Sequence, residues 1–196
     1  MLVGDLESSI HSLTGHIGVL DELMRLLADD LVYGAVVVVG VLWFHRRGLR
    51  AALAVAVGAL LALALGQLLG SLFPESRPFV SDHFTPLIAH AADGSFPSDH
   101  LLVLGAVGGG CMMASRPLAA AAAVMALLVA AARVYVGIHH PVDVIAGFAV
   151  GAACGLVAWA ALASVQRYID GIDATLQRRG LRPVRLGAPT SARPAA

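Results

Sequence analysis

Residues 51–73 read "AALAVAVGALLALALGQLLGSLF", an apolar run without a single charged residue. A helix of this length, at about 1.5 Å per residue, spans the roughly 30 Å hydrocarbon core of a bilayer. The whole chain fits that reading, because only 13% of its 196 residues are charged, 58% are hydrophobic and its mean hydropathy is +0.81. Soluble domains carry about 25% charged residues. The run therefore predicts a transmembrane helix in an integral membrane protein.

Four further apolar segments flank this run and predict additional membrane helices. The first is centred on residues 31–44 and must borrow residues from "LDELMRLLADD" (20–30) to reach the length of a span. The others cover roughly residues 100–114, 117–135 and 142–164. Residues 1–28 differ from them, because apolar side chains recur there only at helical spacing, which is typical of an amphipathic interfacial helix or of a sixth, less hydrophobic membrane helix. These side chains are Ile10, Leu13, Ile17, Leu20, Met24 and Leu27. We predict an all-α fold, a polytopic membrane bundle of five to six transmembrane helices.

The arginines orient the predicted helices. They gather in "HRRGLR" (45–50), in "SRP" (115–117) and in the tail after the last span, which all fall on one side of the membrane. The positive-inside rule makes that side cytoplasmic and places residues 74–99 and 133–143 outside. Three parts follow: an N-terminal helix (1–28), a membrane-embedded domain (29–165) and a cytoplasmic basic tail (166–196) that we expect to be largely disordered.

Other features of the composition have structural explanations. A formal net charge of zero argues against a nucleic-acid-binding protein. Cys111 and Cys154 lie inside apolar runs, which favours buried free thiols over a disulfide. Gly147, Gly151 and Gly155 recur at every fourth position, as in helices that pack closely in lipid.

Three polar clusters lie on the predicted outer side. They read "FPESRPF" (73–79), "DGSFPSDH" (93–100) and "RVYVGIHHPVD" (133–143). A lone Arg at a helix end often only reaches for lipid head groups. Three clusters at the ends of apolar helices on one side favour a functional site instead.

The second cluster suits an anion. Ser98 stands directly before an apolar helix and is a favourable N-cap residue. The free N–H groups of a helix N-terminus bind anions, and His100 falls in the first turn of this helix.

The third cluster suits covalent catalysis. Pro141 is favourable as the first residue of a helix, which puts Asp143 in the first turn, four residues after His139. A carboxylate at that offset can hold one imidazole nitrogen and leave the other free to attack. Arg77 and Arg133 add forked donors for phosphate oxygens. Together these residues predict phosphoryl transfer through a phosphohistidine, with His100 protonating the leaving group.

Two other interpretations compete with this one. The imidazoles of His83, His90, His100, His139 and His140, with nearby aspartates, could hold zinc, but no compact ligand spacing such as HExxH or CxxC is present. A transporter or structural membrane protein with an incidental polar rim is the second alternative. It predicts charged residues within the spans, and the spans after the first have almost none between their ends.

The three clusters resemble the signatures of the type 2 phosphatidic acid phosphatase superfamily of lipid phosphatases. Its third signature, Ser-Arg-x5-His-x3-Asp, is matched by "ARVYVGIHHPVD" at Arg133, His139 and Asp143, with Ala132 in place of Ser. Its second, Pro-Ser-Gly-His, is matched by "PSDH", and its first, Lys-x6-Arg-Pro, keeps Arg77 and Pro78.

Two departures from these signatures narrow the resemblance to one branch of the superfamily. Asp99 stands where Gly is usual, and Gly70 stands at the Lys position. The segment "LFPESRPFV", followed by "AHAADGSFPSDH", is similar to the bacitracin-resistance branch of undecaprenyl-diphosphate phosphatases.

The resemblance implies roles for the residues of the site. His139 would be the nucleophile, Asp143 its orienting carboxylate and His100 the general acid. The phosphate would be held by four residues: Arg77, Ser98, Arg133 and, through its backbone N–H, Asp99. The resemblance implies no metal and no cofactor. His140 lies outside the signature and is interpreted as a rim or capping residue.

The resemblance also implies a function. We expect an enzyme of the bacterial cell membrane, with its site facing outward, that hydrolyses the polyprenyl diphosphate lipid undecaprenyl diphosphate to the monophosphate. Such an enzyme recycles the carrier lipid of cell-wall peptidoglycan synthesis and is linked to bacitracin resistance. Phosphatases of phosphatidylglycerophosphate or phosphatidic acid are the alternative. A non-catalytic lipid-binding or transport protein on the same scaffold is a third reading, which the presence of His100, His139 and Asp143 disfavours.

Overall fold

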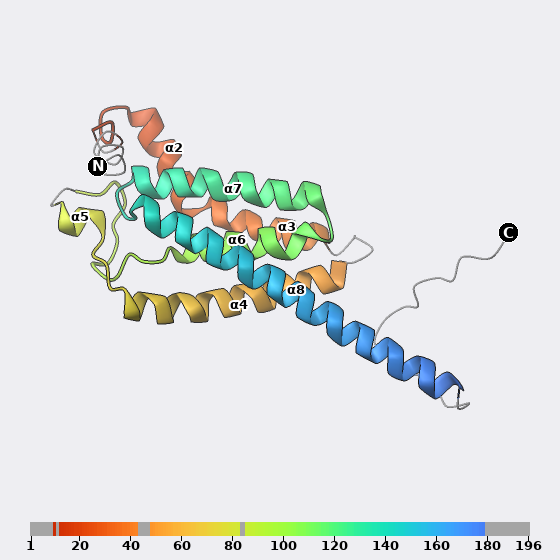
Figure 1. Cartoon of the computed structure of the whole chain (residues 1–196). Helices are drawn as coiled ribbons and strands as arrows, with labels where there is room; N and C mark the ends of the chain where they lie inside the picture. Colours follow the sequence, from red (N-terminus) through yellow and green to blue (C-terminus); the bar gives the residue numbers. More distant parts are fainter. Residues whose placement is uncertain (1–9, 11, 43–47, 83–84, 179–196) are drawn as a thin grey trace. The chain divides into compact units, whose positions relative to one another are not determined.

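The computed structural model describes residues 10, 12–42, 48–82 and 85–178 (Figure 1). Every secondary-structure element within these ranges is a helix, as predicted. In chain order they are α2 (Gly18–Asp29), the 3-10 helix η1 (Leu31–Tyr33), α3 (Gly34–Leu42), α4 (Gly48–Leu72), α5 (Pro78–Ser81), α6 (Asp99–Met112), α7 (Arg116–Tyr135) and α8 (Pro141–Arg178).

Each of the five predicted membrane segments forms an apolar helix, but the helices differ in length. Three are long and apolar enough to cross a bilayer: Leu49–Leu72, Arg116–Tyr135 and Pro141–Ile172. Leu31–Leu42 and Asp99–Met112 are shorter. At about 1.5 Å per residue, the 14 residues of α6 extend only about 21 Å. The chain is a multi-pass membrane protein in which two of the expected spans are short.

Glycines let α6 pack directly against α8, as the glycine spacing predicts. A Cβ atom on Gly151 of α8 would collide with the backbone carbonyl of Leu102, and one on Gly109 of α6 would collide with the carbonyl of Ala152. Small residues allow helix backbones to approach this closely in lipid, where tight packing and not hydrophobic burial holds helices together. A bulkier side chain at either position would push the two helices apart.

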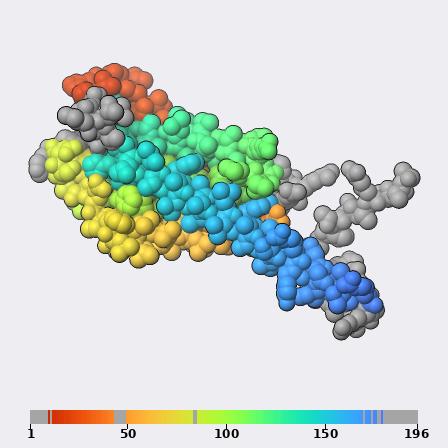
Figure 2. All heavy atoms as spheres, viewed as in Figure 1, coloured from red at the N-terminus to blue at the C-terminus, as the bar shows by residue number. Residues whose placement is uncertain are grey.

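The outward faces of α4 and α7 are apolar, as expected for helices in contact with lipid. In Figure 2, α4 (yellow) and α7 (green) lie on the two sides of the first turns of α8. The exposed large side chains include Leu53, Leu60, Leu61, Leu68 and Leu72 on α4 and Val124, Leu127 and Leu128 on α7. Leucine and valine that would destabilise a water-soluble surface are favourable against acyl chains.

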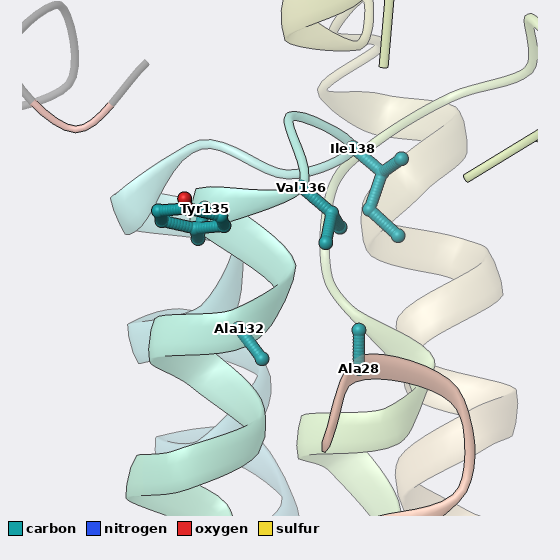
Figure 3. Packing of buried hydrophobic residues seen from close by; sticks show 5 residues of the cluster. All are labelled: Ala28, Ala132, Tyr135, Val136 and Ile138. Atoms are coloured by element: carbon teal, nitrogen blue, oxygen red, sulfur yellow. The ribbon is translucent and has the colours of Figure 1, made fainter. Parts of the chain in front are cut away.

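The N-terminal region forms an amphipathic helix that packs on the end of α7. α2 has 12 residues, well short of the roughly 20 that a span needs. Its last turn brings Ala28 into a small buried cluster with Ala132, Tyr135, Val136 and Ile138 (Figure 3). Ile10, Leu20, Met24 and Leu27, from the predicted apolar face, pack against this cluster. The described part of residues 1–28 thus contains the amphipathic helix α2, and whether the whole segment lies on the membrane or crosses it stays a prediction.

The last helix is longer than the sequence predicts. The fifth span is expected to end near residue 164, but α8 continues to Arg178. Polar side chains stabilise the extension: Gln166 donates a hydrogen bond to Asp170 at 2.9 Å, and Arg178 donates one to Thr175 at 3.2 Å. The chain divides into two compact units, Met1–Trp159 and Ala160–Ala196, so the polar extension belongs to the second. The rest of the predicted disordered tail, residues 179–196, lies outside the described residues.

Candidate active site

The three polar clusters meet at one end of the helices. The ends of α4 and α7 and the starts of α6 and α8 lie together there, because successive helices run in opposite directions (Figure 1). A cavity of about 490 Å³ opens between them. Its lining includes five of the seven predicted site residues, namely Arg77, Asp99, His100, Arg133 and His139, together with Gln67, Gly70, Ser71, His90 and Asp93.

Backbone hydrogen bonds join the loops that carry these residues. The N–H of Ser98 donates to the carbonyl of Asp143 at 3.2 Å, which links the second cluster to the third. The N–H of Ser95 donates to the carbonyl of Glu75 at 2.9 Å, which links the second cluster to the first. These two hydrogen bonds tie the second cluster to both of the others.

His139 lies between a carboxylate and a guanidinium. Its Nδ1 is 3.4 Å from Oδ2 of Asp143, and its Nε2 is 3.5 Å from Nη1 of Arg77. The Nδ1 contact is longer than an ordinary hydrogen bond, and neither His139 Nδ1 nor Asp143 Oδ1 has a hydrogen-bond partner among the described residues. Catalytic hydrogen bonds are often long before substrate binds and shorten in the complex. Nε2 is therefore the nitrogen available to a ligand.

Asp143 is held in place by the start of its own helix. Its Oδ2 accepts the backbone N–H of His140 at 2.8 Å, and the side chain is fully buried. An acidic side chain in the first helical turn commonly reaches back in this way to the N–H of the capping residue. The predicted helix start at Pro141 thus also fixes the carboxylate that faces His139.

Burial sets the charge state of His139. The residue is only 3% exposed, and desolvation lowers its pKa to about 4. Asp143 opposes that shift, whereas Arg133 and Arg77 add to it. The imidazole is therefore neutral at pH 7, and only the neutral form has a lone pair with which to attack phosphorus.

Both predicted arginines are buried with part of the guanidinium already bonded. Arg77 donates from Nε to Oδ1 of Asp93 at 2.8 Å and from Nη1 to the carbonyl of Ile138 at 2.9 Å. Arg133 donates from Nη1 to the carbonyl of Ala28 at 2.9 Å, and its buried Nε has no partner within the described chain. Buried guanidinium groups with unused N–H donors are suited to phosphate oxygens.

Ser98 lies behind the cavity and is absent from its lining. It is the N-cap residue of α6, as predicted, but its side chain makes no capping hydrogen bond. The hydroxyl is fully buried and unpartnered among the described residues. The expected side-chain cap is therefore not formed, although the backbone N–H of Ser98 donates to the carbonyl of Asp143.

The remaining histidines do not form a metal site in the described part of the chain, where no group of three or more metal-ligating side chains occurs. His83, one of the histidines considered for zinc, lies outside the described residues. His140 contacts the carbonyl of Ser76 through Nε2 at 3.1 Å. That contact joins the third cluster to the first, in keeping with a rim residue.

Sequence reasoning missed several groups that support the site. Asp93 belongs to the second cluster and has no predicted role, although it binds Arg77. Asp21 of α2 accepts a buried hydrogen bond from the hydroxyl of Tyr135 at 2.8 Å. Asp21 could have been found, because it is an acidic residue on the inward face of an amphipathic helix. The carbonyl of Ala28, which accepts a hydrogen bond from Arg133, could not, because a backbone group leaves no pattern in the sequence.

Comparisons with known proteins agree on one family. The family description "PAP2 superfamily" matches residues 49–167. The undecaprenyl-diphosphatase BcrC of Bacillus subtilis is 28% identical over 151 residues, which cover 76% of this chain and 78% of that protein.

Two solved structures share the fold. The crystal structure of Aquifex aeolicus LpxE has a TM-score of 0.64 at 20% identity and covers 81% of this chain and 94% of its own. A PAP2-type phosphatidylglycerolphosphate phosphatase from Bacillus subtilis has a TM-score of 0.54 at 24% identity, with 83% and 87% covered.

Proposed function

This chain belongs to the PAP2 superfamily, and from that premise we propose that it hydrolyses undecaprenyl diphosphate to undecaprenyl phosphate and inorganic phosphate. One observation carries the proposal: neutral His139, two buried arginines and His100 converge on a single cavity, with Asp143 behind His139. Similarity to an undecaprenyl-diphosphatase supports the choice of lipid.

The proposed first step is attack on the terminal phosphorus. Nε2 of His139 forms the new N–P bond while the bond from phosphorus to the bridging oxygen breaks. His100, which takes up a proton because the negative charge of the bound diphosphate favours its charged form, gives that proton to the bridging oxygen as undecaprenyl phosphate leaves. Asp143 stabilises the positive charge that develops on the imidazole. Arg77 and Arg133 stabilise the negative charge on the phosphoryl oxygens.

The proposed second step is hydrolysis of the phosphohistidine. His100, now neutral, accepts a proton from a water molecule whose oxygen attacks phosphorus. The N–P bond breaks, its electron pair returns to Nε2 of His139, and inorganic phosphate leaves. His100 is then protonated again, ready for another turnover.

The size and lining of the cavity support a diphosphate over a monophosphate. At about 490 Å³ it holds far more than one phosphoryl group. Gln67, Ser71 and His90 also line it. Gln67 and Ser71 are polar residues near the outer end of the span Leu49–Leu72, and polar residues inside spans mark functional sites by default. We assign these three side chains to the second phosphate.

The proposed location is the bacterial cell membrane, with the site facing outward. The starts of α4 and α7, near the arginine-rich segments, lie at the end of the helices opposite the cavity, and the positive-inside rule makes that end cytoplasmic. Asp82→Cys, in a background without Cys111 and Cys154, should react with a membrane-impermeant maleimide in intact cells. Labelling only after permeabilisation would reverse the orientation.

Phosphate release from purified protein in detergent tests the substrate. The protein should be offered undecaprenyl diphosphate, phosphatidylglycerophosphate and phosphatidic acid in turn, with His139→Ala as the matched inactive variant. We expect the highest kcat/KM with undecaprenyl diphosphate. A higher kcat/KM with either glycerophospholipid would identify that lipid as the preferred substrate and refute the proposed one. No phosphate release from any of the three lipids would favour a binding or transport protein.

A further inference from the structure

Asp93 brings a negative charge into a cavity that we assign to a phosphate-bearing substrate. Its carboxylate lies 2.8 Å from Nε of Arg77 and shares the cavity with Arg133 and His139. A carboxylate repels an anionic ligand, so its presence here disfavours binding unless it does something else for the site.

The carboxylate fixes the plane of the Arg77 guanidinium. Asp93 takes the Nε hydrogen, and the carbonyl of Ile138 takes one from Nη1. Because the guanidinium is planar and rigid, two acceptors on two of its edges determine the direction of every remaining N–H group. Within the described chain, no acceptor contacts Nη2. The same orientation sets Nη1 at 3.5 Å from Nε2 of His139.

Backbone contacts hold the loop that carries Asp93, independently of its carboxylate. The loop is attached to the first cluster by the backbone of its neighbours, through the bridge between Ser76 and Gly94 and the hydrogen bond from Ser95 to Glu75. The Asp93 side chain itself is 62% exposed, and the hydrogen bond from Arg77 lowers its pKa, so it is ionised at pH 7. The same Oδ1 that accepts from Arg77, which is 5% exposed, lies 3.8 Å from Nδ1 of His90, too far for a hydrogen bond.

We propose that Asp93 is a positioning residue for phosphoryl transfer, which holds the Arg77 guanidinium so that its unbonded edge faces the phosphoryl group on His139. Without that hydrogen bond, rotation about the last side-chain bonds would turn the edge away, although Arg77 would keep its charge. The inference rests on the proposed function in one respect: it assumes that the anion bound in the cavity is a phosphoryl group.

Two substitutions separate orientation from charge. Asp93→Ala removes the acceptor, and we expect kcat/KM for undecaprenyl diphosphate to fall roughly tenfold to a hundredfold, as for a misplaced catalytic group. Asp93→Asn keeps an oxygen acceptor without the charge, and it should retain kcat/KM within about threefold. Asp82→Ala, an exposed acidic residue in the same outer region, is the matched control and should have no effect. Equal loss in Asp93→Ala and Asp93→Asn would overturn the positioning role.

A double-mutant cycle shows whether Asp93 acts through Arg77. Orthovanadate, which mimics the transferred phosphoryl group, is titrated calorimetrically into wild type, Asp93→Ala, Arg77→Ala and the double variant. Asp93→Ala should weaken vanadate binding in wild type and change nothing once Arg77 is absent. An equal weakening in both backgrounds would show that Asp93 acts elsewhere and would overturn the inference.

The vanadate readout does not depend on the identity of the lipid. If undecaprenyl diphosphate proves to be the wrong substrate, the cycle still tests the link between Asp93 and Arg77. Asp93→Leu, which keeps the branched shape of the side chain but has no acceptor, replaces Asp93→Ala if the alanine variant is poorly folded in detergent. Unchanged vanadate affinity in a folded Asp93→Leu variant would equally refute the positioning role.

Discussion

Asp143→Asn distinguishes the charge of the buried carboxylate from its shape. Asp143 is fully buried, and its Oδ2 accepts the N–H of His140 at 2.8 Å while lying 3.4 Å from Nδ1 of His139. One oxygen, Oδ2, makes both contacts, so an Asn whose amide oxygen accepts from His140 still presents an oxygen to Nδ1. Asn has nearly the same shape but lacks the negative charge, so it no longer stabilises the positive imidazole ring that forms when Nε2 bonds to phosphorus.

The expected loss is large. A change of this type in the Ser-His-Asp triad costs about four orders of magnitude in kcat, or about 5.5 kcal/mol at about 1.36 kcal/mol per factor of ten. The 3.4 Å contact is longer than the 2.6–3.2 Å expected of an engaged catalytic pair, so Asp143 orients His139 less firmly before substrate binds. We therefore expect kcat to fall by about 10² to 10⁴, with a smaller change in KM.

Single-turnover phosphate release from undecaprenyl diphosphate measures this loss directly. His140→Ala is the matched control, because it removes an adjacent imidazole that contacts the carbonyl of Ser76 at the rim, and it leaves intact the backbone N–H that Asp143 needs. It should reduce kcat by about tenfold or less. A kcat for Asp143→Asn within tenfold of wild type, or equal to that of His140→Ala, would refute the orienting role.

Three further predictions concern charge and packing. Excess EDTA should leave turnover unchanged, because Arg77 and Arg133 supply the positive charge at the phosphoryl group, and a loss that one added metal restores would contradict this. The imidazole NMR signals of His139, assigned by their absence in His139→Gln, should titrate near pH 4. The pKa of His139 in the folded protein lies below its unfolded value of about 6.5, so the unfolded state takes up the proton first as the pH falls. The protein therefore loses stability as the pH falls below about 6.5. An NMR titration midpoint for His139 at pH 6.5 or higher would contradict the effect of burial. Tyr135→Phe leaves the buried Asp21 without its 2.8 Å donor and should lower stability in detergent by about 1–3 kcal/mol, whereas an unchanged melting temperature would show that the contact is dispensable.

The helices were predictable because the membrane imposes long apolar segments. The run at residues 51–73 became α4 with nearly the predicted ends, and the start of α8 at Pro141 follows from the fixed φ of proline. The bounds of α6, Asp99–Met112, agree with the predicted segment 100–114. The first span was expected to borrow residues from 20–30, but α2 ends at Asp29 and η1 separates it from α3. The extension of α8 was missed because its last turns are polar.

The site was predictable where it depends on side chains at the ends of spans. His139, Arg77 and Arg133 stand out there because charged and titratable groups are costly near lipid. The supporting groups were not predictable. Asp93 is exposed and reads as an ordinary loop carboxylate, and a backbone carbonyl such as that of Ala28 acquires its role only through tertiary packing.

Trapping of the covalent intermediate tests the central claim, that His139 is the residue that accepts the phosphoryl group. Undecaprenyl diphosphate labelled in its terminal phosphate is mixed with protein, quenched within milliseconds and digested for mass spectrometry. We predict an acid-labile, alkali-stable phosphate on His139 in wild type and none in His139→Ala. Label that persists in His139→Ala and disappears in His140→Ala would contradict the account and assign the attack to the neighbouring histidine.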